Sequence, residues 1–200
     1  MSAETIARLH ILLEDIEPAI WRRVEVPVTA SLKMLHDIAQ AAMGWENSHL
    51  WHFEAGDRRY GVPDPMWPQG GMVAAKNVKL AALIDGGVSE LIYTYDMGDD
   101  WRHTITFEAV GPGEPDVKYP RFVEGQRRCP PEDVGGLPGY EMFLDAMANP
   151  ANEEHDRLRE WYGGPYNADD IDEPLARRAV AAIANRRHAG KVAYQNSLTR

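Results

Sequence analysis

The chain contains a single cysteine, Cys129, among its 200 residues. A lone thiol excludes an intramolecular disulfide and is typical of a reducing compartment. The chain also lacks the uninterrupted run of about 18 apolar residues that a membrane-spanning helix needs. Its first 19 residues have no basic start followed by an apolar centre, as a signal peptide would. The sequence therefore predicts a cytoplasmic protein that does not enter a membrane.

The chain has fewer basic than acidic residues, with 21 Lys and Arg against 31 Asp and Glu and a formal net charge of -10. This balance disfavours nucleic acid and anionic lipid as partners, since the bulk charge repels both. Ten of the basic residues occur as neighbouring arginines, so a local positive patch for nucleic acid stays open as an alternative. The pairs are Arg22 and Arg23, Arg58 and Arg59, Arg127 and Arg128, Arg177 and Arg178, and Arg186 and Arg187.

The segment around residues 96–100 has the clearest local pattern. Apolar and polar residues alternate on both sides of it, with the period of two that is typical of strands. Between the arms, Gly98 tolerates positive φ, and Asp99 and Asp100 can hydrogen-bond their own backbone. We therefore expect a β-hairpin that gathers acids, an imidazole and aromatic rings at one turn.

Two further hairpins and a helix are expected before it. Residues 7–13 and 20–26 alternate as paired strands, and residues 49–53 and 58–61 as a second pair. Residues 32–43 carry apolar side chains at spacings of three and four between an N-cap serine and a terminating glycine, which predicts the one long helix of this half.

The second half of the chain changes composition twice. Residues 111–139 are rich in proline, glycine and charge, and we expect an ordered loop that crosses the sheet. Residues 140–188 return to helical spacing, and the last helix should end near Arg187 before a tail over residues 191–200. Residues 62–72 should form an irregular loop, and residues 78–84 a strand edge that runs into one helical turn.

Together these segments predict an α+β fold in a single domain over residues 5–190. Its antiparallel sheet is built from hairpins in the order ββαββ then ββ, over residues 5–110. The Pro/Gly loop and the C-terminal helices follow. Nothing indicates the strand-helix alternation of a parallel sheet.

Five motifs in one order resemble the plasmid pRiA4b ORF-3-like family, across about residues 5 to 180. They are LLEDIEPAIWRRVEV (12–26), AAMGWENSHLWHF (41–53), YDMGDDWRHTI (95–105), YPRFVEGQRRCPPEDVGGLPGY (119–140) and WYGGPY (161–166). The resemblance implies an α+β fold in a bacterial or archaeal family, some of whose members are named as transposon passengers or resolvase-type proteins. It implies no established biochemical activity.

The chain departs from the family pattern in residues that could bind a metal. The family commonly has His-Leu-His where this chain has His49-Leu50-Trp51, and further cysteines at the positions of Phe122 and Val134. A thiol-rich or two-histidine metal site is therefore in doubt here. The residues of a recombinase are also missing, because the sequence has no His-x-x-Arg motif for a tyrosine recombinase. Its early serines, Ser2 and Ser31, fall in an expected tail and at an expected helix cap, not at the position of a serine nucleophile.

The acidic turn is nevertheless a candidate metal site. Asp96, Asp99, Asp100 and His103 bring oxygen and nitrogen ligands within eight residues, centred on Asp99 and His103. His49 and Asp133 would complete the ligands if their segments converge on the turn. The alternative is structural: aspartates brace the turn, and His103 is a hydrogen-bonded core residue beside Trp101.

Other candidates have similar structural alternatives. Glu132 or Asp133 could serve as a general acid or base on a rigid loop, or satisfy backbone N–H groups. Cys129 is more typical of a small buried residue than of a nucleophile. Among the six tryptophans, most should be core.

A groove for a peptide, base or small ligand is expected beside the central hairpin and the loop 129–139. Trp45 and Trp67 are its candidate walls, with Trp101 and Glu132. The leading hypothesis is a binding or accessory module of mobile elements, without catalysis or cofactor, whose partner is a protein or small ligand. The competing hypothesis is a metal-dependent hydrolase or nuclease-like enzyme that uses a divalent metal ion at Asp99 and His103.

Overall fold

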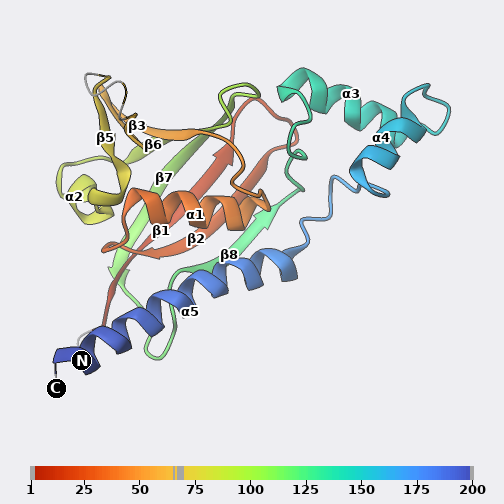
Figure 1. Ribbon diagram of the computed structural model, residues 1–200. Helices are drawn as coiled ribbons and strands as arrows, with labels where there is room; N and C mark the ends of the chain where they lie inside the picture. The colour runs from red at the N-terminus through yellow and green to blue at the C-terminus, as the bar shows by residue number, and fades with distance from the viewer. Residues whose placement is uncertain (1–2, 65, 67–69, 199–200) are drawn as a thin grey trace.

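The computed structural model describes residues 3–64, 66 and 70–198 (Figure 1). The strands are β1 (Thr5–Leu13), β2 (Ile20–Pro27), β3 (Trp51–Ala55), β4 (Arg58–Gly61), β5 (Met72–Ala74), β6 (Glu90–Tyr95), β7 (Trp101–Pro112) and β8 (Arg121–Gln126). The helices are α1 (Leu32–Met43), α2 (Leu80–Asp85), α3 (Gly136–Ala148), α4 (His155–Tyr162) and α5 (Glu173–Leu198), with a 3-10 turn η1 (Ala75–Asn77).

All these strands form one sheet, in the order β5-β4-β3-β6-β7-β1-β2-β8. Neighbours are antiparallel except β4 and β5, which run parallel. The predicted α+β class and the predicted hairpins are confirmed, including the central one, in which Tyr95 pairs with Trp101. A purely antiparallel sheet was wrong at one edge, because β5 pairs in parallel with β4.

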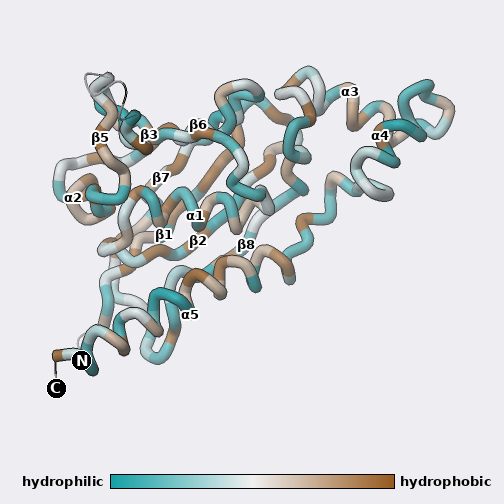
Figure 2. Tube along the Cα trace, in the orientation of Figure 1, coloured by the Kyte–Doolittle hydropathy of each residue, from teal (hydrophilic) through white to brown (hydrophobic). Residues whose placement is uncertain are grey.

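Helix α1 is the predicted long helix, and its ends follow its sequence. The Ser31 hydroxyl accepts a hydrogen bond from the Met34 N–H at 3.2 Å, and Gly44 ends the helix at φ +93°. Hydrophobic and hydrophilic residues both occur along its length, as in an amphipathic helix (Figure 2). Its buried side therefore packs on the sheet.

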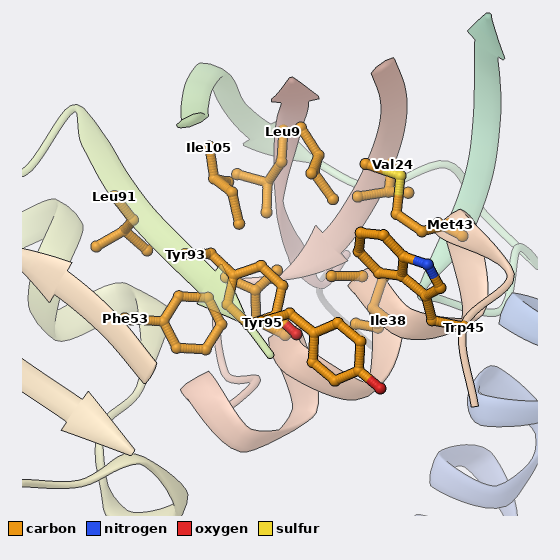
Figure 3. Packing of buried hydrophobic residues seen from close by; sticks show 14 of the residues in the cluster. Leu9, Val24, Ile38, Met43, Trp45, Phe53, Leu91, Tyr93, Tyr95 and Ile105 are labelled. Carbon is orange, nitrogen blue, oxygen red and sulfur yellow. The ribbon is translucent and has the colours of Figure 1, made fainter. Parts of the chain in front are cut away.

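The core lies between α1 and one face of the sheet. Alternate residues of the strands face it, as Tyr93, Tyr95 and Leu9 show in Figure 3. Tyr93 stacks on Phe53 at 4.7 Å between ring centroids, and Tyr95 packs on an aromatic neighbour, Trp45, at 5.1 Å. Helix α5 runs beside α1 and β8 (Figure 1). Buried rings thus hold the first strand of the central hairpin, β6, against the core.

The loop expected over residues 111–139 was wrong in three places. Strand β7 extends into it as far as Pro112, β8 occupies Arg121–Gln126, and α3 begins at Gly136. Strand β8 forms because of tertiary contacts and not because of its local sequence. Its residues pair with β2, about 100 positions earlier in the chain, and Phe122 is buried at 2% exposure. Flanking prolines and glycines concealed this short strand.

The region before the central hairpin is also more regular than expected. Strand β5 and the turn η1 lie between residues 72 and 77. Residues 78–84 follow their prediction, with an isolated bridge between Lys79 and Ser31 that runs directly into the short helix α2. Trp67 of the predicted loop lies outside the described residues.

The last helix does not end near Arg187. It continues through Gly190 to Leu198, so residues 191–198 of the expected tail are helical. Lys191 pairs with Glu4 at 2.8 Å, which extends the helix along the start of β1. A glycine inside a helix costs only about 1 kcal/mol, so it need not end one.

Candidate cation-binding site

The turn of the central hairpin positions Asp96. Its φ is +56°, a conformation that Asp tolerates better than most residues, and its N–H donates to the Leu50 carbonyl at 2.9 Å. Oδ1 accepts hydrogen bonds from the N–H groups of Gly98 at 2.8 Å and Asp99 at 3.3 Å. The turn therefore occupies one carboxylate oxygen and leaves Oδ2 for other partners.

His49 faces that second oxygen from the connection between α1 and β3. Its Nε2 lies 3.6 Å from Asp96 Oδ2, 3.7 Å from Glu132 Oε2 and 3.1 Å from Asp133 Oδ1. The nitrogen has essentially no exposed surface, and none of the three carboxylates meets it in normal hydrogen-bond geometry. His49 therefore points into a group of carboxylates without a directed bond to any of them.

The Pro-rich loop 129–135 brings Glu132 and Asp133 to the hairpin. Glu132 accepts hydrogen bonds from the Tyr95 hydroxyl at 3.0 Å and from the Glu46 N–H at 2.7 Å. Trp45 holds the same loop by donating from Nε1 to the Pro130 carbonyl at 2.9 Å. Three segments far apart in the sequence are therefore tied together at one point.

Tyr95 links these segments as a donor and an acceptor. Its hydroxyl oxygen accepts from the Ser48 N–H at 2.9 Å while its proton goes to Glu132. Burial, and with it the charge of Glu132, raises the pKa of Tyr95. The phenol therefore stays protonated and holds the Glu132 carboxylate in place.

The cluster has more negative charge than its own partners neutralise. No Lys or Arg among the described residues forms an ion pair with Asp96, Glu132 or Asp133, which face only His49. Ligand atoms of His49, Asp96 and Asp133 lie within 4.8 Å of one another. One imidazole nitrogen and two carboxylate oxygens at such distances suit Mn²⁺, Zn²⁺ or Mg²⁺.

The predicted metal centre at Asp99 and His103 is not where these ligand atoms meet. His103 is fully buried on β7, its Nδ1 lies 3.1 Å from the Tyr93 carbonyl, and burial lowers its pKa to about 4. Asp99 accepts from the Gly135 N–H at 3.2 Å, and the Asp100 N–H donates to the Asp96 carbonyl at 2.7 Å. These three residues brace the turn and the core, as the structural alternative stated.

Cys129 is also the buried residue that the alternative described. It is 6% exposed, and burial raises the pKa of its thiol to about 11. A thiol that stays protonated at neutral pH is a poor nucleophile.

A hollow of about 450 Å³ lies beside the loop, where a groove was expected, and is lined by Trp45, Glu132, Asp133 and Trp161, among others. Trp101, the other described wall of the expected groove, does not line it. Trp45 itself is 8% and Trp101 4% exposed, so both belong mainly to the core. Sequence reasoning missed Trp161, which is 46% exposed, because its helical spacing did not show that α4 lies away from the sheet.

The site and the fold define a class of protein: an α+β chain with an eight-stranded, mostly antiparallel sheet and a carboxylate-imidazole cluster at one hairpin turn. The chain belongs to the plasmid pRiA4b ORF-3-like family, whose family model matches residues 5–174. The resemblance seen in the five sequence motifs is thereby confirmed.

Two relatives support the assignment. The chain is 44% identical over 176 residues to the uncharacterized protein y4hQ of Sinorhizobium fredii strain NGR234, and the match covers 86% of each chain. It also resembles the crystal structure of MM3350 from Methanosarcina mazei Go1, a protein of unknown function, with a TM-score of 0.77 at 31% identity. That match covers 84% of this chain and 95% of the other. Both likenesses concern the fold and the family, and neither relative's name states a ligand.

The sequence predicted that the protein does not enter a membrane, and the length and apolar character of the helices bear on this prediction. Across residues 3–64, 66 and 70–198, none of the helices has both the length and the apolar character to cross a membrane.

Proposed function

We propose that this protein is a binding module that holds a divalent cation at His49, Asp96 and Asp133. The observation that carries the proposal is the position of His49 Nε2, within 3.1 to 3.7 Å of three carboxylates that form no ion pair with a Lys or Arg of the described residues. Like charges this close destabilise one another, and a cation among them relieves the repulsion.

Each of the three residues has an atom free for coordination. Asp96 offers Oδ2, since its other oxygen is taken by the turn, and His49 offers Nε2. Asp133 offers Oδ1 from a side chain that is 72% exposed. Glu132 is engaged by Tyr95 and Glu46, so we assign it a positioning role beside the ion.

The cation would have two effects on the molecule. It would clamp the connection before β3, the central turn and the Pro-rich loop, which lie far apart in sequence. It would also keep coordination positions toward solvent on the Asp133 side, next to the hollow of about 450 Å³. A ligand oxygen or nitrogen from that hollow could then complete its coordination.

The test is thermal unfolding of chelator-treated protein with and without Mn²⁺, Zn²⁺ or Mg²⁺. A cation at about 100 times its Kd stabilises the folded chain by about 2.7 kcal/mol, which corresponds to a rise in Tm of about 5–10 °C. His49→Ala and Asp133→Asn should abolish that rise. His188→Ala and Asp57→Asn are matched controls, because these residues are exposed and lie outside the cluster, and should keep it. An equal rise in all five proteins, or none in the wild type, would contradict the proposal.

The metal-dependent hydrolase is a second candidate, moved from Asp99 and His103 to the new cluster. The exposed side of Asp133 favours it, since an ion there keeps a water that it can activate. Metal-loaded protein should then hydrolyse bis(p-nitrophenyl) phosphate, and His49→Ala should not. Turnover that is equal in the two proteins, or absent from both, leaves the binding module as the function.

The association with plasmids or transposons and the cytoplasmic location stay predictions from the sequence.

A further inference from the structure

Helices α3 and α4 lie together at one end of the molecule, beyond the body formed by the sheet and α1 (Figure 1). Residues of α3 reach the core through Tyr140 and Phe143, whereas α4 has no buried residue. Trp161 and Tyr162 of α4 pack on Phe143 at 5.9 and 5.6 Å between ring centroids, and Tyr162 also packs on Tyr166 at 5.2 Å. Trp161 and Met142 nevertheless stay 46% and 66% exposed, so the described residues leave apolar surface uncovered on this pair of helices.

A hollow of about 400 Å³ lies between these two helices and the Pro-rich loop, and we call it the α3–α4 groove. Its larger apolar side chains are Val134, Met142, Leu158 and Trp161, of which Met142 is 66% and Trp161 46% exposed. An exposed tryptophan beside an exposed methionine is typical of a binding surface rather than of a solvated helix.

The rim of the groove is acidic. Asp133, Asp145 and Glu154 line it, and its one basic residue, Arg157, is already ion-paired with Glu154. Hydrophilic residues predominate on α4 (Figure 2). Residues 140–162 contain six Asp and Glu but only two Arg, in a chain of net charge -10. The field at the groove therefore attracts cations and repels phosphates.

The groove continues past the loop into the neighbouring hollow of about 450 Å³, because Asp133 and Trp161 line both. Glu46 and Glu132 add further carboxylates there, whereas Arg128 of the same hollow is bound to Asp170 at 3.1 Å. Carboxylate side chains thus occur along the whole length of the two joined hollows. A single ion would use a fraction of it, whereas an extended chain would use all of it.

We propose that the α3–α4 groove binds a basic peptide segment of a partner protein. Lys or Arg side chains of the segment pair with Asp145 and Asp133, and one of them stacks on the exposed face of Trp161, where cation–π attraction adds to the charge. Aliphatic parts of the segment cover Met142 and Leu158. Asp133 is shared with the proposed cation, whereas Asp145, Met142 and Trp161 are not ligands of it, so variants at Asp145 and Trp161 test this inference separately.

The test is fluorescence anisotropy of a labelled nine-residue peptide of alternating Arg and Leu, titrated with the full-length chain at about 0.15 M salt, where long-range attraction is screened. A peptide with Glu in place of Arg and a labelled DNA duplex are titrated in parallel. Trp161→Ala and Asp145→Asn should each weaken binding of the Arg peptide by at least about fivefold.

Matched controls separate the groove from net charge. Glu141→Gln makes the same charge change on α3 outside the groove lining, and Tyr194→Ala removes an exposed aromatic ring from α5. Both should bind like the wild type. Circular dichroism checks the fold of Trp161→Ala, and Asp145→Asn repeats the test without loss of a ring.

Three outcomes would overturn the proposal: equal losses in the groove variants and the controls, binding of the Glu peptide or the duplex as tightly as the Arg peptide, or no binding of the Arg peptide. The titration is run in the presence of a chelator, so that His49 and its neighbours hold no divalent cation while peptide binding is measured.

Discussion

At the scale of single residues, Arg22 is the most consequential buried group outside the site. Its side chain is 1% exposed, and no carboxylate among the described residues pairs with it. It donates instead to the carbonyls of Ala42 at 2.8 Å and Gln126 at 2.9 Å. One guanidinium thereby joins β2 to the end of α1 and to β8, which explains how a strand hidden in a Pro/Gly-rich segment is held.

Arg22→Met should therefore lower the free energy of unfolding by about 3 kcal/mol, because it leaves buried carbonyls without donors. Urea denaturation followed by circular dichroism would measure the loss. Arg58→Met is the control, since Arg58 is exposed on β4 and its removal should change stability by less than about 0.5 kcal/mol. Equal effects of the two substitutions would show that Arg22 is not a structural link.

At the scale of elements, the Pro-rich loop and the start of α3 are docked on the central turn by backbone contact. Gly136 has φ +67°, and a Cβ at this position would lie 2.9 Å from the Asp99 carbonyl oxygen. The neighbouring Gly135 N–H donates to the Asp99 side chain. The loop that carries Glu132 and Asp133 is thus placed by glycines that let two backbones approach closely.

Gly136→Ala should lower the free energy of unfolding by more than the strain of a left-handed backbone alone would. Gly56 offers a matched comparison, because it has φ +55° with nothing within 4 Å of an added Cβ. Gly56→Ala should lower the free energy of unfolding by about 1 kcal/mol, from left-handed strain. Gly136→Ala should lower it by about 2–3 kcal/mol, because overpacking against Asp99 adds to that strain. Chemical denaturation of both variants would decide, and equal losses would mean that the loop is not docked as described.

At the scale of the whole molecule, two buried histidines make stability depend on pH. Burial lowers the pKa of His36 and of His103 to about 4 from the ordinary 6.5. Both rings are therefore neutral in the folded chain under conditions in which the unfolded chain protonates them. Unfolding therefore takes up protons between about pH 4, the pKa of these histidines in the folded chain, and pH 6.5, their ordinary pKa.

Stability should accordingly be constant above pH 6.5 and fall as the pH is lowered toward 4. Each histidine contributes a loss of about 3 kcal/mol over that range, as an upper figure for its shift in pKa. Urea midpoints at pH 7, 6, 5 and 4.5 would follow the loss. His103→Gln should remove part of the slope, whereas His188→Gln, at an exposed position, should leave it unchanged. A wild-type curve that is flat from pH 7 to 4.5 would refute this.

Prediction from sequence succeeded where the pattern is local. The alternation around Tyr95 and Trp101 predicted the central hairpin, and the spacing after Ser31 predicted α1, because one buried face dictates both periods. It failed at β8 and at the end of α5. There the outcome depends on pairing with β2 and on a contact with Glu4, which local composition does not encode.

The candidate site was also predicted only in part: its residue types were named from the sequence, but its geometry was not. Sequence analysis placed His49, Asp96, Asp133 and Glu132 among its candidates, because their residue types bind metals or transfer protons. It centred the site on Asp99 and His103, with His49 and Asp133 to complete it, since proximity in sequence was the only distance it had. In the structure the ligand atoms of His49, Asp96 and Asp133 meet instead, and His103 is buried in the core.

The sequence by itself determined the α+β class, the central hairpin and the chemical character of its turn, because strand and turn preferences act within a few residues. Only the tertiary structure decided which carboxylates share one imidazole and that Trp161 stays exposed. Those features depend on how the Pro-rich loop docks on the turn, which is set by contacts between segments that local patterns do not relate.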